Sequence, residues 1–442
     1  FITEDNDVAV GDVAVTVNRV ARSNAGLSNK TDGTQSDLVT SNNGDIVLQT
    51  LNGSITVNDG SSPADNVGVD ADGSGDILLR AQSTNDDKDV DLNANVQSAS
   101  GNISVIAARG VLQNGNITTG GTIDVYAENG DITMADTYTA QASDANIRYE
   151  AGQAITLGEL NAGSAAVALV AGTDVVDGGD TGTDVVASDL RIDAGNAAGG
   201  TTDALDVNVD NIAVEAGAGG LFISETNVVT VRAVSQVSVG RVAPTAASGD
   251  ETDPSASADL SDLTTAPDGA AVLVANAGPL TIDEGSDADG AGVDAGGASN
   301  VRLAADSGSI TIDSDVQSGS GHITILADTS LTQNADVSTS GGTVDAQAGD
   351  AIVMADGTTT ASGGGDVRYK NTDSGDFSLS AINAGGGDVA IVTVGSITDY
   401  ADSGEVDITA NSALIDADVD IGTGTNHIET DVSSLTAQSG GA

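Results

Sequence analysis

The sequence contains no cysteine and no tryptophan, and it has little proline, few aromatic residues and few bases. Among 442 residues there are 5 Pro, 5 Tyr and 3 Phe, and 13 bases stand against 66 acids. Without cysteine there is neither a disulfide framework nor thiol chemistry. Without large aromatic residues, a core has to be built from Val, Ile, Leu and Ala. The net charge of −53 disfavours binding to nucleic acid and to anionic membranes.

Two further absences narrow the class of protein. We find no apolar run of about 18 residues, so no membrane insertion is expected, and we find no secretory signal peptide. No apolar segment keeps the helical period of 3.6, which predicts a protein almost free of helix. Glycine is abundant, with 57 residues, but it follows no Gly-X-Y period, so collagen is excluded.

The chain repeats itself with a period of about 221 residues. The string NVQSASGNISVIAARGVLQN from Asn95 matches DVQSGSGHITILADTSLTQN from Asp315, and FITEDNDVAV from Phe1 matches LFISETNVVTV from Leu221. We therefore predict two tandem copies, residues 1–221 and 222–442, the first of which starts in the middle of a module. We expect them to form one continuous rod that is a segment of a longer array.

Short segments of alternating apolar and polar residues predict strands that recur every 20 to 24 residues. Turn signals such as Gly-Asp, Asn-Gly and Ser-Gly separate them. A second series of strands falls between the members of the first. The first series is Ile103/Val105, Ile123/Val125, Ile147/Tyr149, Val167/Leu169, Leu190/Ile192 and Ile212/Val214, and the second includes Ile132/Met134, Ile155/Leu157 and Val175.

Two all-β architectures fit this pattern. A chain of β-sandwiches usually has strands every 8–12 residues and a core of large residues, often with a tryptophan. A parallel β-helix, or β-solenoid, stacks coils of about 20 residues and buries small β-branched side chains in a narrow interior. The strand period, the Val/Ile/Ala core and the glycine-rich corners favour the β-solenoid.

Several of the strand segments resemble a known family. The strings SGNISVIA, GGTIDVYAENGDITM, SGHITILA and GSITID are similar to coils of filamentous-haemagglutinin-type giant bacterial surface and secreted repeat proteins. The resemblance implies a parallel β-helix, secretion to a bacterial surface, and work as an adhesin, fibre or sheath component. The amino-terminal secretion domain of that family is not recognisable in this sequence.

Two acidic loops suggest a metal ion as a ligand. Alternate acids around glycines suit a hard cation, because the carboxylates can converge while glycine turns the chain. Ordinary acidic turns are the alternative, since Asp is also a common turn residue and neither loop is an EF-hand. The predicted calcium ligands are Asp70, Asp72 and Asp76 in VDADGSGD of the first copy, and Asp287, Asp289 and Asp294 in SDADGAGVD of the second.

No other motif predicts a site. The two histidines lie far apart and cannot form a zinc site without further ligands. Arg148 and Arg368 occupy matching places beside Tyr149 and Tyr369, and each arginine is expected to pair with a turn carboxylate or to stack on the tyrosine. No catalytic triad, P-loop or dinucleotide fingerprint can be defended. The sequence therefore predicts no catalytic residue and no organic cofactor.

These patterns favour an acidic, extracellular or cell-surface structural protein that is not an enzyme. We expect a rigid β-helical rod that forms a filament or sheath by contact with itself, end to end or laterally. One alternative is the stalk of an adhesin whose binding domain lies elsewhere, with surface glycans of a host or neighbouring cell as partners. Another is a polysaccharide-cleaving β-helix, which would use paired carboxylates.

Overall fold

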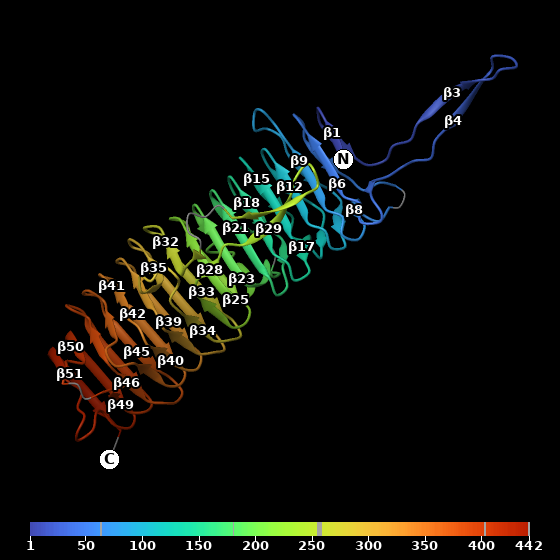
Figure 1. Cartoon of the computed structure of the whole chain (residues 1–442). Coiled ribbons are helices and arrows are strands. Elements are labelled where there is room, and N and C mark those ends of the chain that lie inside the picture. Colours follow the sequence, from blue (N-terminus) through green and yellow to red (C-terminus); the bar gives the residue numbers. More distant parts are fainter. Residues whose placement is uncertain (62–63, 180, 254–258, 402–403, 441–442) are drawn as a thin grey trace. The chain divides into compact units, whose positions relative to one another are not determined.

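The computed structural model describes residues 1–61, 64–179, 181–253, 259–401 and 404–440. All regular elements in these ranges are β-strands, and the coils stack in parallel (Figure 1). The predicted all-β parallel β-solenoid is therefore confirmed, as is the tandem repetition. Within these ranges there is also no helix long and apolar enough to cross a membrane.

The chain divides into two compact units. Unit 1 consists of Phe1–Gly172, Gly178–Asp180 and Val237–Pro254, and unit 2 consists of Thr173–Asp177, Thr181–Gln236 and Ser255–Ala442. These bounds differ from those of the sequence copies, because a solenoid coil contacts mainly its neighbours, whatever copy they belong to. The segment Val237–Pro254 belongs to the second copy in sequence and to unit 1 in space.

The coils of unit 1 carry three columns of parallel strands, one on each face. Each strand pairs with the strands of the coils before and after it in the same column. The first column is β1 Ile2–Glu4, β6 Ile46–Thr50, β9 Ile77–Ala81, β12 Ile103–Ala107, β15 Ile123–Ala127, β18 Ile147–Ala151 and β21 Ala166–Ala171. The second is β2 Val8–Val10, β7 Ile55–Val57, β10 Val90–Leu92, β13 Val111–Gln113, β16 Ile132–Met134 and β19 Ile155–Leu157. The third is β5 Leu38–Val39, β8 Val67–Ala71, β11 Asn95–Ser98, β14 Ile117–Thr119, β17 Thr139–Ala142 and β20 Glu159–Asn161.

Unit 2 repeats the arrangement. Its first column is β26 Gly220–Glu225, β33 Ala271–Ala275, β36 Val301–Ala305, β39 Ile323–Ala327, β42 Val344–Ala348, β45 Val367–Asn371 and β48 Asp388–Thr393. The second is β27 Val229–Val231, β34 Leu280–Ile282, β37 Ile310–Ile312, β40 Leu331–Gln333, β43 Ile352–Met354, β46 Phe377–Leu379 and β49 Ile397–Asp399. The third is β32 Leu263–Thr265, β35 Ala291–Ala295, β38 Asp315–Ser318, β41 Val337–Thr339, β44 Thr359–Ala361 and β47 Ala381–Asn383.

Several longer or shorter strands complete unit 2. Long strands run across two faces of a coil and pair with each other in parallel, β23 with β25 and β50 with β51. Two short strands pair in an antiparallel sense, β28 with β31. The bounds are β22 Asp174–Asp177, β23 Val185–Ala194, β24 Ala197–Ala198, β25 Leu205–Ala216, β28 Val234–Ser235, β31 Asp259–Leu260, β50 Ile408–Ala417 and β51 Thr430–Ser439.

The interior of each unit is built by side chains that alternate along the strands. In β12, Ile103, Val105 and Ala107 point inward and are fully buried, and Ile103 stacks on Ile77 and Ile123 of the neighbouring coils. Stacking of like residues fills a narrow core with small β-branched side chains at close packing. Ile147 and Val367, at matching places of the two copies, both point inward and are buried.

Stacked glycines form one corner of unit 2. A Cβ placed on Gly342 would lie 1.8 Å from the carbonyl oxygen of Gly321, and one on Gly365 would lie 2.0 Å from that of Gly342. The coils therefore approach so closely here that a side chain has no room. The glycine excess in the sequence comes partly from this contact between coils, in addition to the tight turns.

Two antiparallel hairpins leave the solenoid. The first joins β3 Thr16–Val20 to β4 Leu27–Thr31, and it stands away from the coils (Figure 1). The second joins β29 Ser238–Val242 to β30 Ser248–Thr252 and lies across the first-column strands of unit 1. The strand period of 20 to 24 residues did not predict either hairpin.

Candidate functional site

The predicted calcium loop of the first copy does not bring its three acids together. Asp70 lies on β8, and Asp72 accepts a hydrogen bond from the Asn42 amide at 3.0 Å. Asp76 accepts one from the Asn102 amide at 2.7 Å. In the described part of the chain, these acids are not among the groups of three whose oxygens all lie within 4.8 Å of one another. Two of them instead cap backbone N–H groups of other coils.

The predicted loop of the second copy does converge, with a partner that the sequence did not reveal. Carboxylate oxygens of Asp287 and Asp289 lie within 4.8 Å of each other and of Asp262. Asp294, the third predicted ligand, stands on β35 outside this group but lines the same cavity of about 220 Å³. We call Asp262, Asp287 and Asp289 the acidic cluster.

Asp262 is the buried member of the acidic cluster. Only 3% of its surface is exposed, and no described residue forms a hydrogen bond with its Oδ1. Its backbone has φ of 66°, a left-handed conformation that Asp and Asn tolerate better than most residues. Burial raises the pKa of Asp262 to about 7, as do the charges of Asp287, Asp289 and Glu284, against a weaker opposing effect of the Gly285 N–H.

The similar strings in the two predicted loops occupy different places in the coil. Asp70 and Asp294 hold the same register position, because Val69 pairs with Leu38 as Val293 pairs with Leu263. Asp287 and Asp289 precede their third-column strand, whereas Asp72 and Asp76 follow theirs. Ser-Asp-Leu occurs at residues 36–38, 188–190 and 261–263, so this string alone could not have identified Asp262.

Two further groups of three carboxyls stand at equivalent positions of the two copies, both within unit 2. In one, the Asp206 amide donates to Asp184 Oδ2 at 2.8 Å, and in the other the Glu429 amide donates to Asp407 Oδ2 at 2.7 Å. Burial is the main reason that the pKa rises to about 8 for Asp184 and to about 7 for Asp407. Near neutrality, protonation therefore relieves repulsion within each group. The groups are Asp177, Asp184 and Asp206, and Asp399, Asp407 and Glu429.

The hairpin β29–β30, which we call the clasp, is fixed to the outer face of unit 1 by backbone hydrogen bonds. The Gly240 amide donates to Thr122 Oγ1 at 2.8 Å, and the Val242 amide donates to Ser104 Oγ at 2.9 Å. The Val242 side chain is buried against Val47 and Leu78. The coils thus offer hydroxyl groups and an apolar patch that match one strand of the clasp.

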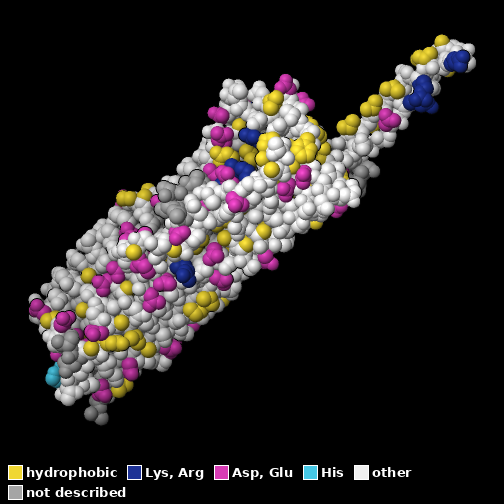
Figure 2. All heavy atoms as spheres, in the orientation of Figure 1, with side chains coloured by type: hydrophobic (Ala, Val, Ile, Leu, Met, Phe, Trp, Pro, Cys, Tyr) yellow, Lys and Arg dark blue, Asp and Glu magenta, His cyan; other side chains and the backbone are white. Residues whose placement is uncertain are grey.

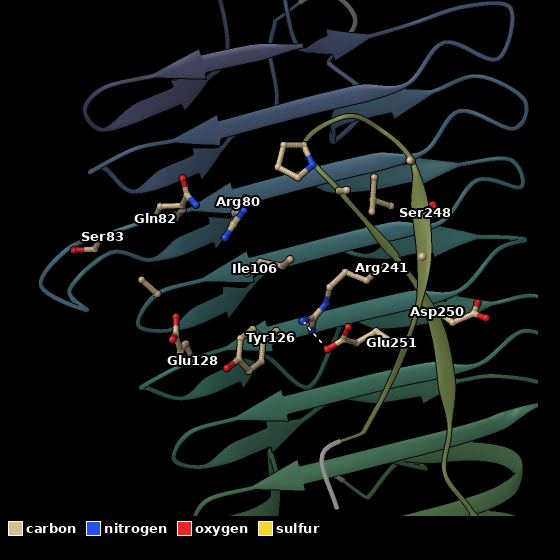
Figure 3. A pocket seen from close by; sticks show the side chains of 17 residues that line it. Arg80, Gln82, Ser83, Ile106, Tyr126, Glu128, Arg241, Ser248, Asp250 and Glu251 are labelled. Atoms are coloured by element: carbon tan, nitrogen blue, oxygen red, sulfur yellow. Dashed lines mark hydrogen bonds and ion pairs between the residues drawn. The ribbon is translucent and has the colours of Figure 1, made fainter.

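A buried ionic network lies beneath the clasp. Arg148 donates to Asp124 Oδ1 at 2.9 Å from a neighbouring strand, and the side chains of both are fully buried. Arg241 of the clasp bonds the same carboxylate at 2.6 Å and Glu251 at 3.2 Å, and it packs over the Tyr126 ring at 5.0 Å (Figure 3). The expectation for Arg148 was wrong, because its partner Asp124 lies on a strand and not in a turn.

A cavity of about 700 Å³ opens between the clasp and the coils. Figure 3 shows Arg80, Gln82 and Tyr126 on the coil side, with Arg241 and Glu251 on the clasp side. The charged groups of Arg241 and Glu251 are already engaged in holding the clasp. The cavity therefore lies along the contact between the clasp and the coils.

The same ion pair recurs in unit 2 without a cover. Arg368 pairs with Asp345 at 2.7 Å in the register in which Arg148 pairs with Asp124. The Arg368 and Asp345 side chains are 41% and 40% exposed, against 0% for both Arg148 and Asp124. The clasp accounts for the difference, because it covers the first pair and nothing described covers the second.

Comparisons with family models, with curated proteins and with solved structures found no match to this chain.

Proposed function

We propose that this chain is a structural segment of an extracellular rod, fibre or sheath at a bacterial surface, and that it is not an enzyme. The function of the chain is then to stack repeats along one axis. The support comes from the way the repeats join each other. The family resemblance of the coil strings, the absence of cysteine and the strong acidity fit a surface location.

The observation that carries the proposal is a junction inside unit 2. There the long strand β25 pairs along its length with β26, β27 and β32 of the next coil. This is the place where the first copy passes into the second. It shows which strand edges meet when one repeat follows another.

Both halves of that junction recur elsewhere in the chain. β51 pairs on β50 as β25 pairs on β23, since Leu435 lies beside Ala413 as Ile212 lies beside Leu190. β1, β2 and β5 pair on β6, β7 and β8 in the register in which β26, β27 and β32 pair on β33, β34 and β35. β51 can therefore pair through its backbone with β1, β2 and β5 of another repeat, as β25 pairs with β26, β27 and β32. The two repeats can belong to one polypeptide or to two.

Sedimentation velocity over a range of concentrations tests this proposal. We expect the purified chain to form end-to-end oligomers. Leu435→Asp should weaken them about tenfold or more, because Leu435 is half exposed on β51 and its counterpart Ile212 is buried in the junction. Val419→Asp is the control, since Val419 is similarly exposed but lies in a turn. A wild-type chain that stays monomeric would contradict the proposal.

A further inference from the structure

The first-copy hairpin β3–β4 is the counterpart of the clasp. TVNRVA from Thr16 matches SVGRVA from Ser238, so that Arg19 corresponds to Arg241. The strands pair alike, Thr16 with Thr31 and Ser238 with Thr252. Both hairpins also leave the solenoid between a second-column and a third-column strand. The two hairpins are therefore the same element of the repeat.

The two hairpins differ in what they contact. In the clasp, Val239 and Val242 are each 1% exposed. In β3–β4, the corresponding Val17 and Val20 are 55% and 61% exposed, and Leu27 is 67% exposed. Figure 2 shows hydrophobic side chains and bases along this projecting hairpin. An element that buries its apolar face in one copy leaves that face open in the other, which marks it as a contact surface.

The second copy has an uncovered face that corresponds to the one under the clasp. Asp345 and Arg368 repeat the ion pair, and Thr324 and Thr343 repeat the two hydroxyl groups that accept clasp amides. These residues lie on or beside β39, β42 and β45 of unit 2. Among the described residues, one hairpin and one face thus remain uncovered, and the face keeps the ion pair and the hydroxyl groups that hold the clasp in the first copy.

We propose that the hairpin β3–β4 docks on the face of β39, β42 and β45 of a second copy of this chain. Arg19 then bonds Asp345 as Arg241 bonds Asp124. The inference rests on the proposed structural function and names the contact that secures one repeat to the preceding one. It ties successive chains by a side-on contact in addition to the pairing of strand edges.

Charge supports this partner. The segment Thr16–Thr31 carries three of the 13 bases, Arg19, Arg22 and Lys30, and no acid, in a chain of net charge −53. Basic segments are drawn to surfaces of opposite charge, and another copy of this chain is such a surface. On the uncovered face, Asp366 replaces Asn146, which adds a negative charge there. The same substitution removes one contact, because Asn146 Nδ2 donates to the clasp carbonyl of Ser238 at 2.8 Å and a carboxylate cannot donate.

Three further substitutions on the uncovered face work against docking. Arg302 stands in the register position of Leu78, on which the clasp's Val242 packs. Gln347 stands in that of Tyr126, the ring beneath Arg241.

Lys370 is the third substitution, and it stands in the register position of Glu150, beside Arg368. It would face a basic hairpin, in which Lys30 stands where the clasp has Glu251. Lys370→Glu should therefore tighten the contact.

Complementary charge reversal tests the docking. We expect Arg19→Asp and Asp345→Arg each to weaken self-association in sedimentation velocity about tenfold or more. An equimolar mixture of the two variants should regain it, because each variant then meets a partner of opposite charge. Arg22→Asp is the matched control with the same change in charge, since its clasp counterpart is the uncharged Pro244.

The outcomes separate this inference from the proposed function. Recovery in the mixture supports the docking. Oligomers that weaken with Leu435→Asp but respond equally to Arg19→Asp and Arg22→Asp would overturn the docking and leave end-to-end pairing standing. A wild-type chain that is monomeric at every concentration would overturn both.

A second inference concerns the acidic cluster and rests on a different observation. Buried polar atoms in proteins are nearly always hydrogen-bonded, yet Asp262 Oδ1 is buried without a hydrogen-bond partner among the described residues. A carboxylate oxygen of Asp262 also lies within 4.8 Å of one from each of Asp287 and Asp289. The surrounding cavity of about 220 Å³ has space for an ion with some of its water. Three carboxylates at one point repel one another unless a cation or a proton neutralises them.

We infer that the acidic cluster is a site for a divalent cation, with calcium as the best fit because it accepts several oxygen ligands in flexible geometry. Asp262 is the central ligand, and Asp287 and Asp289 complete the protein's share. Of the predicted ligands, Asp294 stands at the rim of the cavity. The ion would join the segment before β32 to the segment before β35.

Asp262→Asn tests this inference, because its effect on the melting temperature should change sign when calcium is added. Asn tolerates the left-handed backbone and keeps the shape of Asp, so the variant should fold. In a high-sodium buffer with a chelator, its melting temperature should lie above that of the wild type, because a buried charge without a partner has been removed. With millimolar calcium it should lie below, since the wild type gains binding energy that the variant lacks.

The control is Asp356→Asn, which removes the same charge from an exposed turn of unit 2. It should respond to calcium as the wild type does. Isothermal titration with calcium should show a binding event in the wild type and in Asp356→Asn that Asp262→Asn has lost. Equal calcium responses in all three proteins would overturn the inference.

Discussion

Arg148 and Arg368 belong to ion pairs of identical register that differ in their burial. Removing one partner of a buried pair leaves an uncompensated charge and typically costs about 3–5 kcal/mol. An exposed pair contributes only about 0–1 kcal/mol. The two arginines therefore provide a matched test of how much the clasp contributes to the stability of this solenoid.

We expect Arg148→Met to lower the free energy of unfolding by about 1.5–3 kcal/mol, because buried Asp124 loses a charged hydrogen-bond donor but keeps Arg241 as a partner. Arg368→Met should lower it by less than about 1 kcal/mol. Urea unfolding of both variants at one salt concentration measures the difference. Equal losses would mean that the clasp does not shield the Arg148–Asp124 pair in solution.

At the scale of the coil, the stacked glycines set the spacing between neighbouring turns of backbone. A Cβ on Gly342 would meet the carbonyl oxygen of Gly321, while one on the adjacent Gly341 would have nothing within 4 Å. Gly342→Ala should destabilise the protein by about 1–3 kcal/mol, the usual cost of overpacking. Gly341→Ala should change stability little, and thermal melts of the two variants would show it. A harmless Gly342→Ala would mean that the coils separate easily at this corner.

The strands could be predicted from sequence because the coil imposes a regular period. Each inward residue, such as Ile103 or Ile123, stacks on an equivalent residue of the next coil, so the same short pattern recurs along the chain. The strand pattern did not predict polar contacts in the interior. One of them is the hydrogen bond that the Tyr149 hydroxyl donates to Gln113 Oε1 at 2.6 Å. A residue's partner across coils cannot be found from local alternation.

The acidic cluster and the clasp could be predicted only in part, for a related reason. Asp287 and Asp289 were found because they are neighbours in sequence, whereas Asp262 reaches them from the segment before β32. The clasp was missed because an excursion from a coil interrupts the period that reveals the strands. Only the comparison of Arg19 with Arg241 between the copies could have indicated it.

For the molecule as a whole, buried carboxyls make stability depend on pH. The pKa rises to about 8 for Asp184 and to about 7 for both Glu225 and Asp407, mainly because these groups are buried. A carboxyl whose pKa is higher in the folded state stabilises the fold at pH values below its unfolded pKa. That contribution is lost as the pH rises through the folded pKa.

We therefore expect the free energy of unfolding to fall between about pH 5 and about pH 8, by about 1.4 kcal/mol per pH unit for each such group that titrates. Asp184→Asn should flatten part of this slope, since Asn resembles the protonated acid and can donate to Asp177. Urea titrations in a chelator and fixed salt measure it. A stability that rises towards pH 8 would contradict these shifts.

We propose that repeats of this chain join end to end through strand edges like those at the internal junction of unit 2. Electron microscopy of the purified chain at high concentration tests it most directly. We expect filaments in which β51 of one copy abuts β1, β2 and β5 of the next, with parallel strands continuing across the contact. Isolated particles at every concentration, or assemblies joined without strand pairing at these edges, would contradict it.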